Sequence, residues 1–314
     1  MNILFAAPEN AWGGFLHMIR AELPQHHFQC TGRFGIDTLK GSHVLIPTMT
    51  PITRQVLEQA DQLRLVQQCG AGIEGVDLQA ARDLNIWVAN VPTGSSGNAD
   101  SVAELGIYLM IGLSRDFRGM AQNMSRRKMG QPQGKALCGR SVGIVGLGGI
   151  GRALAKRLIP FGVTLMGIKR TEPEMAKEEL GLIWAGGPEE LPHLLQESDF
   201  VVLCTPLTPQ TRNLMSDSSF SQMKQGSFLI NLSRGGLVDR DALQLALASE
   251  RIAGAGLDVF WEEPPDPNDP IFSYNVLATP HIAGSTDVSM RGIVRVVADN
   301  IRRVERNMKP LYCK

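Results

Sequence analysis

Short apolar runs alternate with segments of helical periodicity along most of the chain, and this alternation constrains the fold more than any other feature. Buried strands are predicted at residues 3–6, 44–46, 65–66, 86–89, 141–145, 163–168, 200–204, 228–231 and 255–259. Helices are predicted at residues 15–23, 53–60, 76–84, 99–118, 152–161 and 288–306. Strands that alternate with helices favour parallel sheets covered on both faces. The predicted fold class is α/β.

The chain length of 314 residues suggests two domains, since a domain averages roughly 150 residues. Apolar residues make up 43% of the chain, which is enough to fill two cores. A Gly-, Pro- and Gln-rich, partly basic stretch at residues 126–139 is predicted to be a surface loop, and the alternation restarts after it. We therefore expect two α/β domains that join near residue 99.

Composition excludes several classes of protein. The 31 basic residues balance the 31 acidic ones, which argues against a nucleic-acid or anionic-membrane partner. The longest near-apolar stretch, residues 102–113, is shorter than the ~20 residues of a spanning helix, and no signal peptide is apparent. The five cysteines are widely spaced without a CxxC pattern, which argues against a disulfide framework and a metal site. We expect a soluble, cytoplasmic protein.

A glycine-rich motif lies between a predicted strand and a predicted helix. Gly146, Gly148 and Gly151 form a GxGxxG pattern, with Gly149 and Ile150 inside it, directly after the strand at residues 141–145. A helix and a further strand complete a βαβ unit. Backbone amides at such a helix N-terminus can bind a pyrophosphate, because no Cβ atom obstructs its approach. The alternative is a tight turn that only packs the helix on the strand. We predict a dinucleotide site here.

A second GxGxxG match occurs at Gly70, Gly72 and Gly75. It also joins a predicted strand to a predicted helix. A turn in an ordinary α/β domain explains this match as well as a binding role does, so the motif alone does not decide between them.

Three isolated polar side chains, Arg234, Glu263 and His281, follow the ends of predicted strands, where open α/β sheets bind ligands. Reduction of a ketone by a nicotinamide needs a proton donor, and His281 can be the acid/base. Glu263 can orient the imidazole and favour its cationic form. Arg234 can bind a substrate carboxylate through two hydrogen bonds. Each residue taken alone could instead be a surface or strand-capping side chain.

Taken together, these residues resemble a known family. The order and spacing of the glycine motif, Arg234, Glu263 and His281 are similar to those of the D-isomer-specific 2-hydroxyacid dehydrogenases, which include phosphoglycerate dehydrogenase and glyoxylate/hydroxypyruvate reductase. The similarity runs from about residue 65 to residue 286, and the first 60 residues match only loosely. The resemblance implies that Arg234 binds the substrate, that Glu263 is the partner of the histidine, and that His281 is the acid/base.

The resemblance implies further site residues. Asp258 matches the position that holds the nicotinamide carboxamide, and backbone amides near Ala71 and Gly72 match those that receive the substrate carboxylate. Arg234 and His281 also contact the substrate. The remaining cofactor-lining positions implied are Thr205, Pro206, Ser233, His281 and Gly284.

The resemblance also implies a domain layout. Residues 1–98 begin the substrate domain, residues 99–285 form an NAD(P)-binding Rossmann domain, and residues 286–314 return as a C-terminal helix to the substrate domain. The fold would then hold Rossmann-like and flavodoxin-like domains, with the active site in the cleft between them. A homodimer through the cofactor domain is expected, and the long helix predicted at residues 99–118 suits that role.

The cofactor preference is predicted from the end of the strand at residues 163–168. NAD-preferring relatives place an Asp or Glu there, whereas this chain has Lys169 followed by Arg170 and Thr171. Two cations suit the 2′-phosphate of NADP(H). We predict a preference for NADP(H) with NAD(H) tolerated. The alternative is that both cations are solvated loop charges and that either nucleotide serves.

The expected reaction is the reduction of a small 2-oxoacid, of the glyoxylate or hydroxypyruvate type. Phosphoglycerate dehydrogenases carry arginines where this chain has residues 47–49 (Pro-Thr-Met) and 67–68 (Gln-Gln), so phosphoglycerate is disfavoured. One alternative is a relative with another hydride donor, such as formate or phosphite, although formate dehydrogenases replace the carboxylate of Glu263 with an amide. Another is a nucleotide-sensing corepressor of the same fold.

Overall fold

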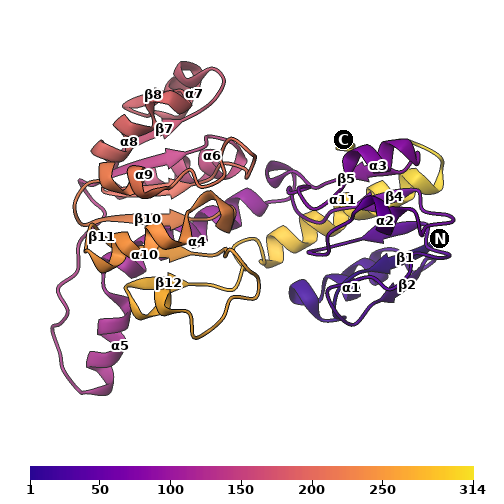
Figure 1. Ribbon diagram of the computed structural model, residues 1–314, viewed down its shortest axis with the longest axis horizontal. Helices are drawn as coiled ribbons and strands as arrows, with labels where there is room; N and C mark the ends of the chain where they lie inside the picture. Colours follow the sequence, from indigo (N-terminus) through magenta and orange to yellow (C-terminus); the bar gives the residue numbers. More distant parts are fainter. The chain divides into compact units, whose positions relative to one another are not determined.

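The computed structural model describes residues 1–314, which form two compact units. Unit 1 contains Met1–Asn98 and Gly284–Lys314, and unit 2 contains Ala99–Ala283 (Figure 1). Each unit is built around its own parallel sheet, so the α/β fold class predicted from the sequence is confirmed. None of the helices combines the length and the apolar character that a membrane crossing requires.

The sheet of unit 1 has five parallel strands in the order β2-β1-β3-β4-β5. This is the strand order of flavodoxin-like folds. The strands are β1 (Asn2–Phe5), β2 (His27–Cys30), β3 (Val44–Ile46), β4 (Leu65–Gln67) and β5 (Trp87–Ala89). The sequence did not predict β2, because this edge strand carries a single buried side chain, Phe28, and lacks an apolar run.

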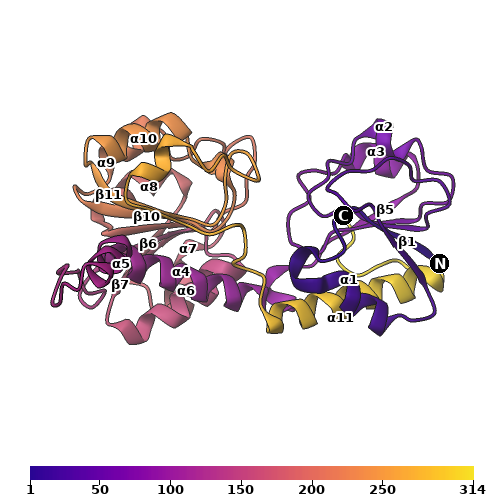
Figure 2. The same ribbon diagram turned by 90° about the horizontal axis from the view of Figure 1, so that it is seen from below.

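Two pairs of helices cover the sheet of unit 1. They are α1 (Ala11–Glu22), α2 (Arg54–Leu57), α3 (Leu78–Asp83) and α11 (Asp287–Glu305), with a short 3-10 helix η1 (Thr93–Ser95). Figure 2 shows α1 and α11 on one face and α2 and α3 on the other. Phe15 and Ile19 of α1 share one buried cluster with Ile293 and Val297 of α11. The last part of the chain therefore completes the core of the first part.

Unit 2 contains seven parallel strands in the order β12-β11-β10-β9-β6-β7-β8. Counted from β6, this is the Rossmann order with one strand added at the end, and the order reverses between β6 and β9. The strands are β6 (Ser141–Val145), β7 (Thr164–Ile168), β8 (Trp184–Gly186), β9 (Phe200–Leu203), β10 (Ser227–Asn231), β11 (Ile252–Leu257) and β12 (Val276–Ala278). Their carboxyl ends lie at one edge, where all predicted site residues of this unit follow them.

Helices cover both faces of the larger sheet. Figure 2 places α4, α6 and α7 on one face and α8, α9 and α10 on the other. The helices are α4 (Asn98–Ser114), α5 (Phe117–Ser125), α6 (Gly149–Leu158), α7 (Pro173–Leu180), α8 (Leu191–Glu197), α9 (Asp217–Gln222) and α10 (Arg240–Ala248). The 3-10 helices are η2 (Ile159–Phe161), η3 (Pro188–Glu190), η4 (Gly235–Leu237) and η5 (Pro270–Ser273). Burial on both faces explains why the strands read as continuous apolar runs.

Two predicted helices need correction. The single helix predicted at residues 99–118 is two helices, α4 and α5, because Asp116 between them takes a left-handed conformation with φ of 52°. Its side chain then accepts a hydrogen bond from the Gly119 amide at 3.0 Å and caps α5. The helix predicted at 152–161 begins earlier, at Gly149, and ends at Leu158. The last residues of the glycine motif, Gly149 to Gly151, therefore lie in its first turn.

Candidate active site

The glycine motif forms a close turn between β6 and α6. Gly146 has φ of +103°, and a Cβ atom there would lie 2.8 Å from the backbone nitrogen of Thr205. A Cβ atom on Gly151 would lie 2.1 Å from the carbonyl oxygen of Gly146. Beside Gly148, by contrast, there is open space, and no side chain caps the N-terminus of α6. This arrangement fits a dinucleotide, because amides at a helix N-terminus face a space without side chains.

The predicted cofactor-lining residues after β9 and β10 lie beside this turn. Thr205 follows β9 and approaches Gly146 closely, and its carbonyl oxygen accepts a hydrogen bond from the hydroxyl of Ser233. The carbonyl oxygen of Pro206 accepts a hydrogen bond from the Thr211 hydroxyl at 2.8 Å. The ends of β6, β9 and β10 thus come together where the strand order reverses.

Glu263 and His281 form the central pair of the site. Nδ1 of His281 and Oε2 of Glu263 are 2.8 Å apart, and Oε1 of Glu263 accepts a hydrogen bond from the Phe260 amide at 3.0 Å. Burial raises the pKa of Glu263, but the hydrogen bond with His281 and the charges of His281 and Arg234 outweigh it, so the pKa is lowered. Glu263 is therefore a carboxylate at neutral pH, able to orient the imidazole and to stabilise its cation.

Asp258 fixes the loop that carries His281. Its side chain accepts hydrogen bonds from the Thr279 hydroxyl at 2.7 Å and from the amides of Ile282 and Ala283 at 2.9 and 3.0 Å. Burial is the largest influence on Asp258 and raises its pKa. Both carboxylate oxygens thus bind residues flanking His281, which itself takes a left-handed φ of 54°. The hydrogen bonds of Asp258 therefore fix the shape of this loop.

Arg234 lies in the turn after β10. The turn is held by Asn231, whose amide donates to the Arg234 carbonyl oxygen at 2.8 Å, while Nη1 of Arg234 donates to the Ser233 carbonyl oxygen at 2.7 Å. A Cβ atom on Gly235 would lie 2.1 Å from the Phe260 carbonyl group. The Arg234 turn therefore packs directly on the segment leading to Glu263, and its charge contributes to lowering the pKa of Glu263.

The remaining predicted site residues of unit 2 lie at the end of β7. The backbone amide of Lys169 donates to the Gly186 carbonyl oxygen at 2.9 Å, which fixes the start of the loop after the strand. Arg170, the next residue, is exposed. No carboxylate follows this strand before Glu172.

Ala71, Gly72 and Gly284 belong to unit 1. The carbonyl oxygen of Ala71 accepts a hydrogen bond from the Asn90 side chain at 2.6 Å, in the loop between β4 and α3. A Cβ atom on Gly284 would lie 2.2 Å from the side chain of Asn98. An asparagine side chain thus holds the Ala71 loop by a hydrogen bond, and another lies close against Gly284, each within unit 1.

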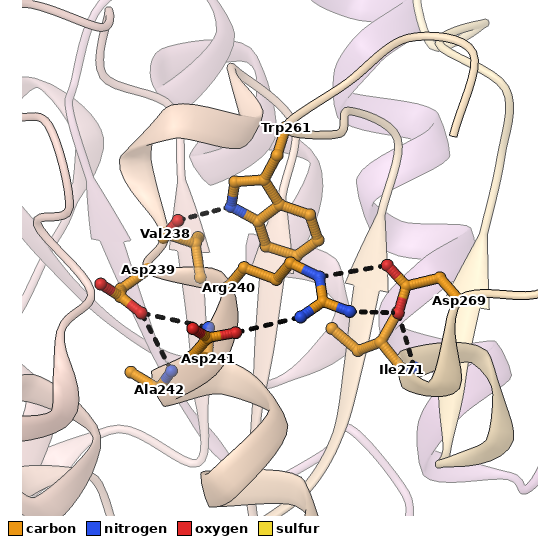
Figure 3. Close-up of polar contacts among 8 residues, drawn as sticks. All are labelled: Val238, Asp239, Arg240, Asp241, Ala242, Trp261, Asp269 and Ile271. Atoms are coloured by element: carbon orange, nitrogen blue, oxygen red, sulfur yellow. Dashed lines mark hydrogen bonds and ion pairs between the residues drawn. The ribbon is translucent and has the colours of Figure 1, made fainter. Parts of the chain in front are cut away.

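Thr279 and a polar cluster around Arg240, Trp261 and Asp269 were not predicted from the sequence. Figure 3 shows the cluster. The only signal in the sequence was the concentration of prolines after Glu263, which marks a stiff segment. No group of three His, Cys, Asp or Glu side chains suited to a metal ion occurs.

Comparisons with known proteins identify the family of this chain. The model of the D-isomer specific 2-hydroxyacid dehydrogenase family, NAD binding domain, matches residues 107–283, more than half of the chain. The chain is 34% identical over 274 residues to a D-3-phosphoglycerate dehydrogenase of Methanocaldococcus jannaschii, covering 86% of this chain and 51% of that protein. It thus spans about half the length of this relative.

Two further proteins match over most of their own length. A hydroxypyruvate reductase of Thermotoga maritima is 33% identical over 273 residues, covering 85% of this chain and 84% of that protein. The apo-structure of D-lactate dehydrogenase from Escherichia coli superimposes with a TM-score of 0.84 and 26% identity, covering 100% of this chain and 99% of the other. By sequence and by fold, the chain belongs to the D-isomer specific 2-hydroxyacid dehydrogenase family.

Proposed function

We propose that this protein is an NAD(P)-dependent oxidoreductase that interconverts a small 2-oxoacid and its D-2-hydroxyacid. The observation that carries the proposal is the pair formed by Glu263 and His281, 2.8 Å apart, with Arg234 beside it in a unit that has Rossmann strand order. Carbonyl reduction requires three groups: an acid/base, an anion that stabilises it and a cation that binds the substrate.

The residues have separate roles in this proposal. A reduced nicotinamide, when bound, supplies the hydride. His281 donates a proton to the carbonyl oxygen, and Glu263 orients the ring and stabilises its cation before the transfer. Arg234 binds the carboxylate beside the carbonyl group and polarises the carbonyl. In the oxidation direction, His281 accepts the hydroxyl proton.

We assign the cofactor to unit 2, where Gly146, Gly148, Gly149, Ile150 and Gly151 would hold the pyrophosphate. The open space beside Gly148 and the uncapped N-terminus of α6 support this assignment. The remaining cofactor contacts proposed are Lys169, Arg170, Thr205, Pro206, Ser233, Asp258, His281 and Gly284. The substrate domain would consist of residues 1–98 and 286–314, with residues 99–285 as the cofactor domain.

We propose glyoxylate or hydroxypyruvate as the substrate, with backbone amides near Ala71 and Gly72 receiving its carboxylate. The similarity to a hydroxypyruvate reductase supports this choice. Gln67, at a position where phosphoglycerate dehydrogenases carry a cation, is fully buried and accepts a hydrogen bond from Asn300 at 2.7 Å. It therefore supplies no charge for a phosphate group.

A panel of substrates tests the proposal. The purified protein should oxidise reduced nicotinamide nucleotides with glyoxylate and hydroxypyruvate, and the reverse reaction should accept D-hydroxyacids but not their L-isomers. Pyruvate, formate, phosphite and 3-phosphoglycerate complete the panel. Nucleotide binding without turnover on any of these would contradict the proposal and favour a nucleotide-sensing role.

We further propose that NADP(H) is preferred and NAD(H) tolerated. Arg170 is exposed directly after β7, and no acidic residue there would repel a 2′-phosphate. Arg170→Ala is expected to reduce kcat/KM for NADPH roughly tenfold, since a hydrogen-bonded charge contributes about 1.5 kcal/mol, and to leave NADH almost unaffected. The measurement is the ratio of the two efficiencies in wild type and variant. A wild-type preference for NADH, or an unchanged ratio, would contradict the assignment.

We propose that the chain forms a homodimer through α4 and α5 of unit 2. Large apolar side chains are exposed along these helices and just after them, and exposed apolar patches mark interaction sites. They are Tyr108, Ile111, Phe117, Met120, Met124 and Met129. Equilibrium sedimentation decides the point, since the mass of a single chain would contradict it. A reducing cytoplasmic location is proposed as well, because none of the five cysteines is paired.

A further inference from the structure

The segment that carries Glu263 is fastened to the start of α10 at two points. The indole Nε1 of Trp261 donates a hydrogen bond to the Val238 carbonyl oxygen at 2.6 Å. Eight residues later, Asp269 accepts two hydrogen bonds from Arg240, at 3.1 Å from Nε and at 2.7 Å from Nη2. Figure 3 shows both contacts side by side. Together they form what we call the Arg240 clamp.

The other side of the clamp is the segment that carries Arg234. Only the short helix η4 separates Arg234 from Val238, and Arg240 is the first residue of α10. Asp239 caps α10 by accepting hydrogen bonds from the amides of Asp241 and Ala242 at 3.1 and 3.0 Å. The clamp therefore joins the connection that holds Arg234 to the connection that holds Glu263.

The chain between the two fastened points is stiff. Pro264, Pro265 and Pro267 fix three backbone φ angles between Trp261 and Asp269. The turn that follows is closed by the side chain of Asp266, which accepts a hydrogen bond from the Asn268 amide at 2.8 Å. Because this segment is stiff, a displacement of Asp269 or Trp261 also displaces Glu263.

Arg240 and Asp269 form an ion pair with two hydrogen bonds. The Asp269 side chain is 19% exposed and also accepts a hydrogen bond from the Ile271 amide at 2.9 Å, which starts η5. The hydrogen bonds from Arg240 are the largest influence on Asp269 and lower its pKa. Two parallel hydrogen bonds fix orientation as well as distance, unlike a loose pair of exposed charges.

We propose that Arg240, Asp269 and Trp261 are positioning residues that hold the Glu263 carboxylate against His281 and keep this pair beside Arg234. The inference rests on the proposed function for its catalytic consequence. Each of the three acts through Glu263.

Kinetics of Arg240→Met and Asp269→Asn provide the first test. Because misplaced catalytic groups lose rate steeply with distance, kcat for 2-oxoacid reduction is expected to fall roughly tenfold in each variant, with KM for the nucleotide unchanged. The double variant should lose no more than Arg240→Met alone, since that substitution already removes both hydrogen bonds to Asp269. Arg240→Lys, which keeps the charge but not the paired hydrogen bonds, should recover only part of the rate.

The pH dependence separates positioning from general stability. The charged groups around Glu263 are His281 and Arg234, and Asp258 lies beside His281. Loosening the contact with His281 leaves burial to raise the pKa of Glu263 and weakens the anion that stabilises the protonated imidazole. The kcat–pH profile of Arg240→Met for 2-oxoacid reduction should therefore shift toward lower pH, as should that of Glu263→Gln, which removes the charge altogether. A merely structural ion pair would lower the melting temperature without moving the profile.

A matched control comes from an ion pair away from the site. Arg291 pairs with Asp287 one turn away in α11, and both side chains are more than 60% exposed. Arg291→Met removes the same side chain type but should leave kcat and the pH profile unchanged. Trp261→Phe, which keeps an aromatic side chain but is smaller and lacks the Nε1 donor, should shift both in the same way as Arg240→Met.

Hydrogen exchange gives a readout that does not need turnover. The Phe260 amide donates to Oε1 of Glu263, so its exchange reports whether the carboxylate stays in place. Exchange is expected to be roughly tenfold faster in Arg240→Met and Trp261→Phe than in wild type and Arg291→Met, corresponding to a loss of about 1.4 kcal/mol.

The outcomes distinguish the two proposals. If wild type reduces 2-oxoacids while Arg240→Met and Asp269→Asn keep its kcat, pH profile and Phe260 exchange, the positioning role is overturned and the proposed function stands. If wild type lacks turnover on the whole panel, the proposed function fails, and Phe260 exchange alone decides whether the clamp holds Glu263. Asp269→Asn keeps the oxygen that caps η5, so it remains informative if Arg240→Met does not fold.

Discussion

His281→Gln is expected to lower kcat for 2-oxoacid reduction by ~10²–10⁴, because the variant cannot donate a proton to the carbonyl oxygen at neutral pH. Glutamine keeps a polar side chain opposite Oε2 of Glu263, which His281 approaches at 2.8 Å, so the surrounding loop should stay in place. Asp258 continues to hold that loop through Thr279, Ile282 and Ala283.

Steady-state kinetics at saturating 2-oxoacid, together with fluorescence titration of the reduced nucleotide, separate chemistry from binding. Nucleotide affinity should stay within a few-fold of wild type. His193→Gln is a matched control in the same unit, since His193 stacks edge-on against Trp184 near β8 and has no place in the proposed chemistry. A His281→Gln protein with near wild-type kcat would remove His281 from the mechanism.

Arg234→Lys is expected to lower kcat/KM for glyoxylate about 100-fold or more. Lysine keeps the positive charge but loses the planar fork that binds a carboxylate through two hydrogen bonds, and bonds to charged groups are worth about 1.5–3 kcal/mol. The Nη1 group of Arg234 also donates to the Ser233 carbonyl oxygen at 2.7 Å, and this contact is lost as well.

The comparison should use glyoxylate and hydroxypyruvate with the nucleotide saturating. Arg291→Lys, at an exposed position on α11, controls for the substitution itself. The loss should appear with every carboxylate-bearing substrate, because the guanidinium recognises the group that they share. Equal efficiencies of Arg234→Lys and wild type on glyoxylate would show that Arg234 does not bind the carboxylate.

The strands of the two sheets were largely predictable, because a strand covered on both faces reads as an apolar run. The prediction for β3 (Val44–Ile46) and β6 (Ser141–Val145) agrees with the structure to the residue. It failed for three strands that lie at sheet edges, namely β2, in which only Phe28 is buried, β8 and β12. The spacing of apolar residues therefore predicts strands that are buried on both faces, but not most of the strands at the edges of the sheets.

Backbone breaks and long-range contacts were not predictable in the same way. The left-handed conformation of Asp116, which ends the expected long helix, is one that Asp tolerates but does not require. Asp258 could be assigned a place beside a ligand by resemblance, but its bonds to Thr279 and the following amides depend on how β11 and β12 lie side by side. The Arg240 clamp depends on the same kind of contact between distant segments.

The discontinuity of unit 1 has a consequence for the order of folding. Residues of α11, including Ile293, Val297 and Ile301, fill the same core as Phe15 and Ile19 of α1. A growing chain lacks α11 until all of unit 2 has been made, so one face of the five-stranded sheet stays without this cover while unit 2 is synthesised. Unit 2 is continuous in sequence and can close its core earlier. The amino-terminal part of the chain is thus made first and completed last.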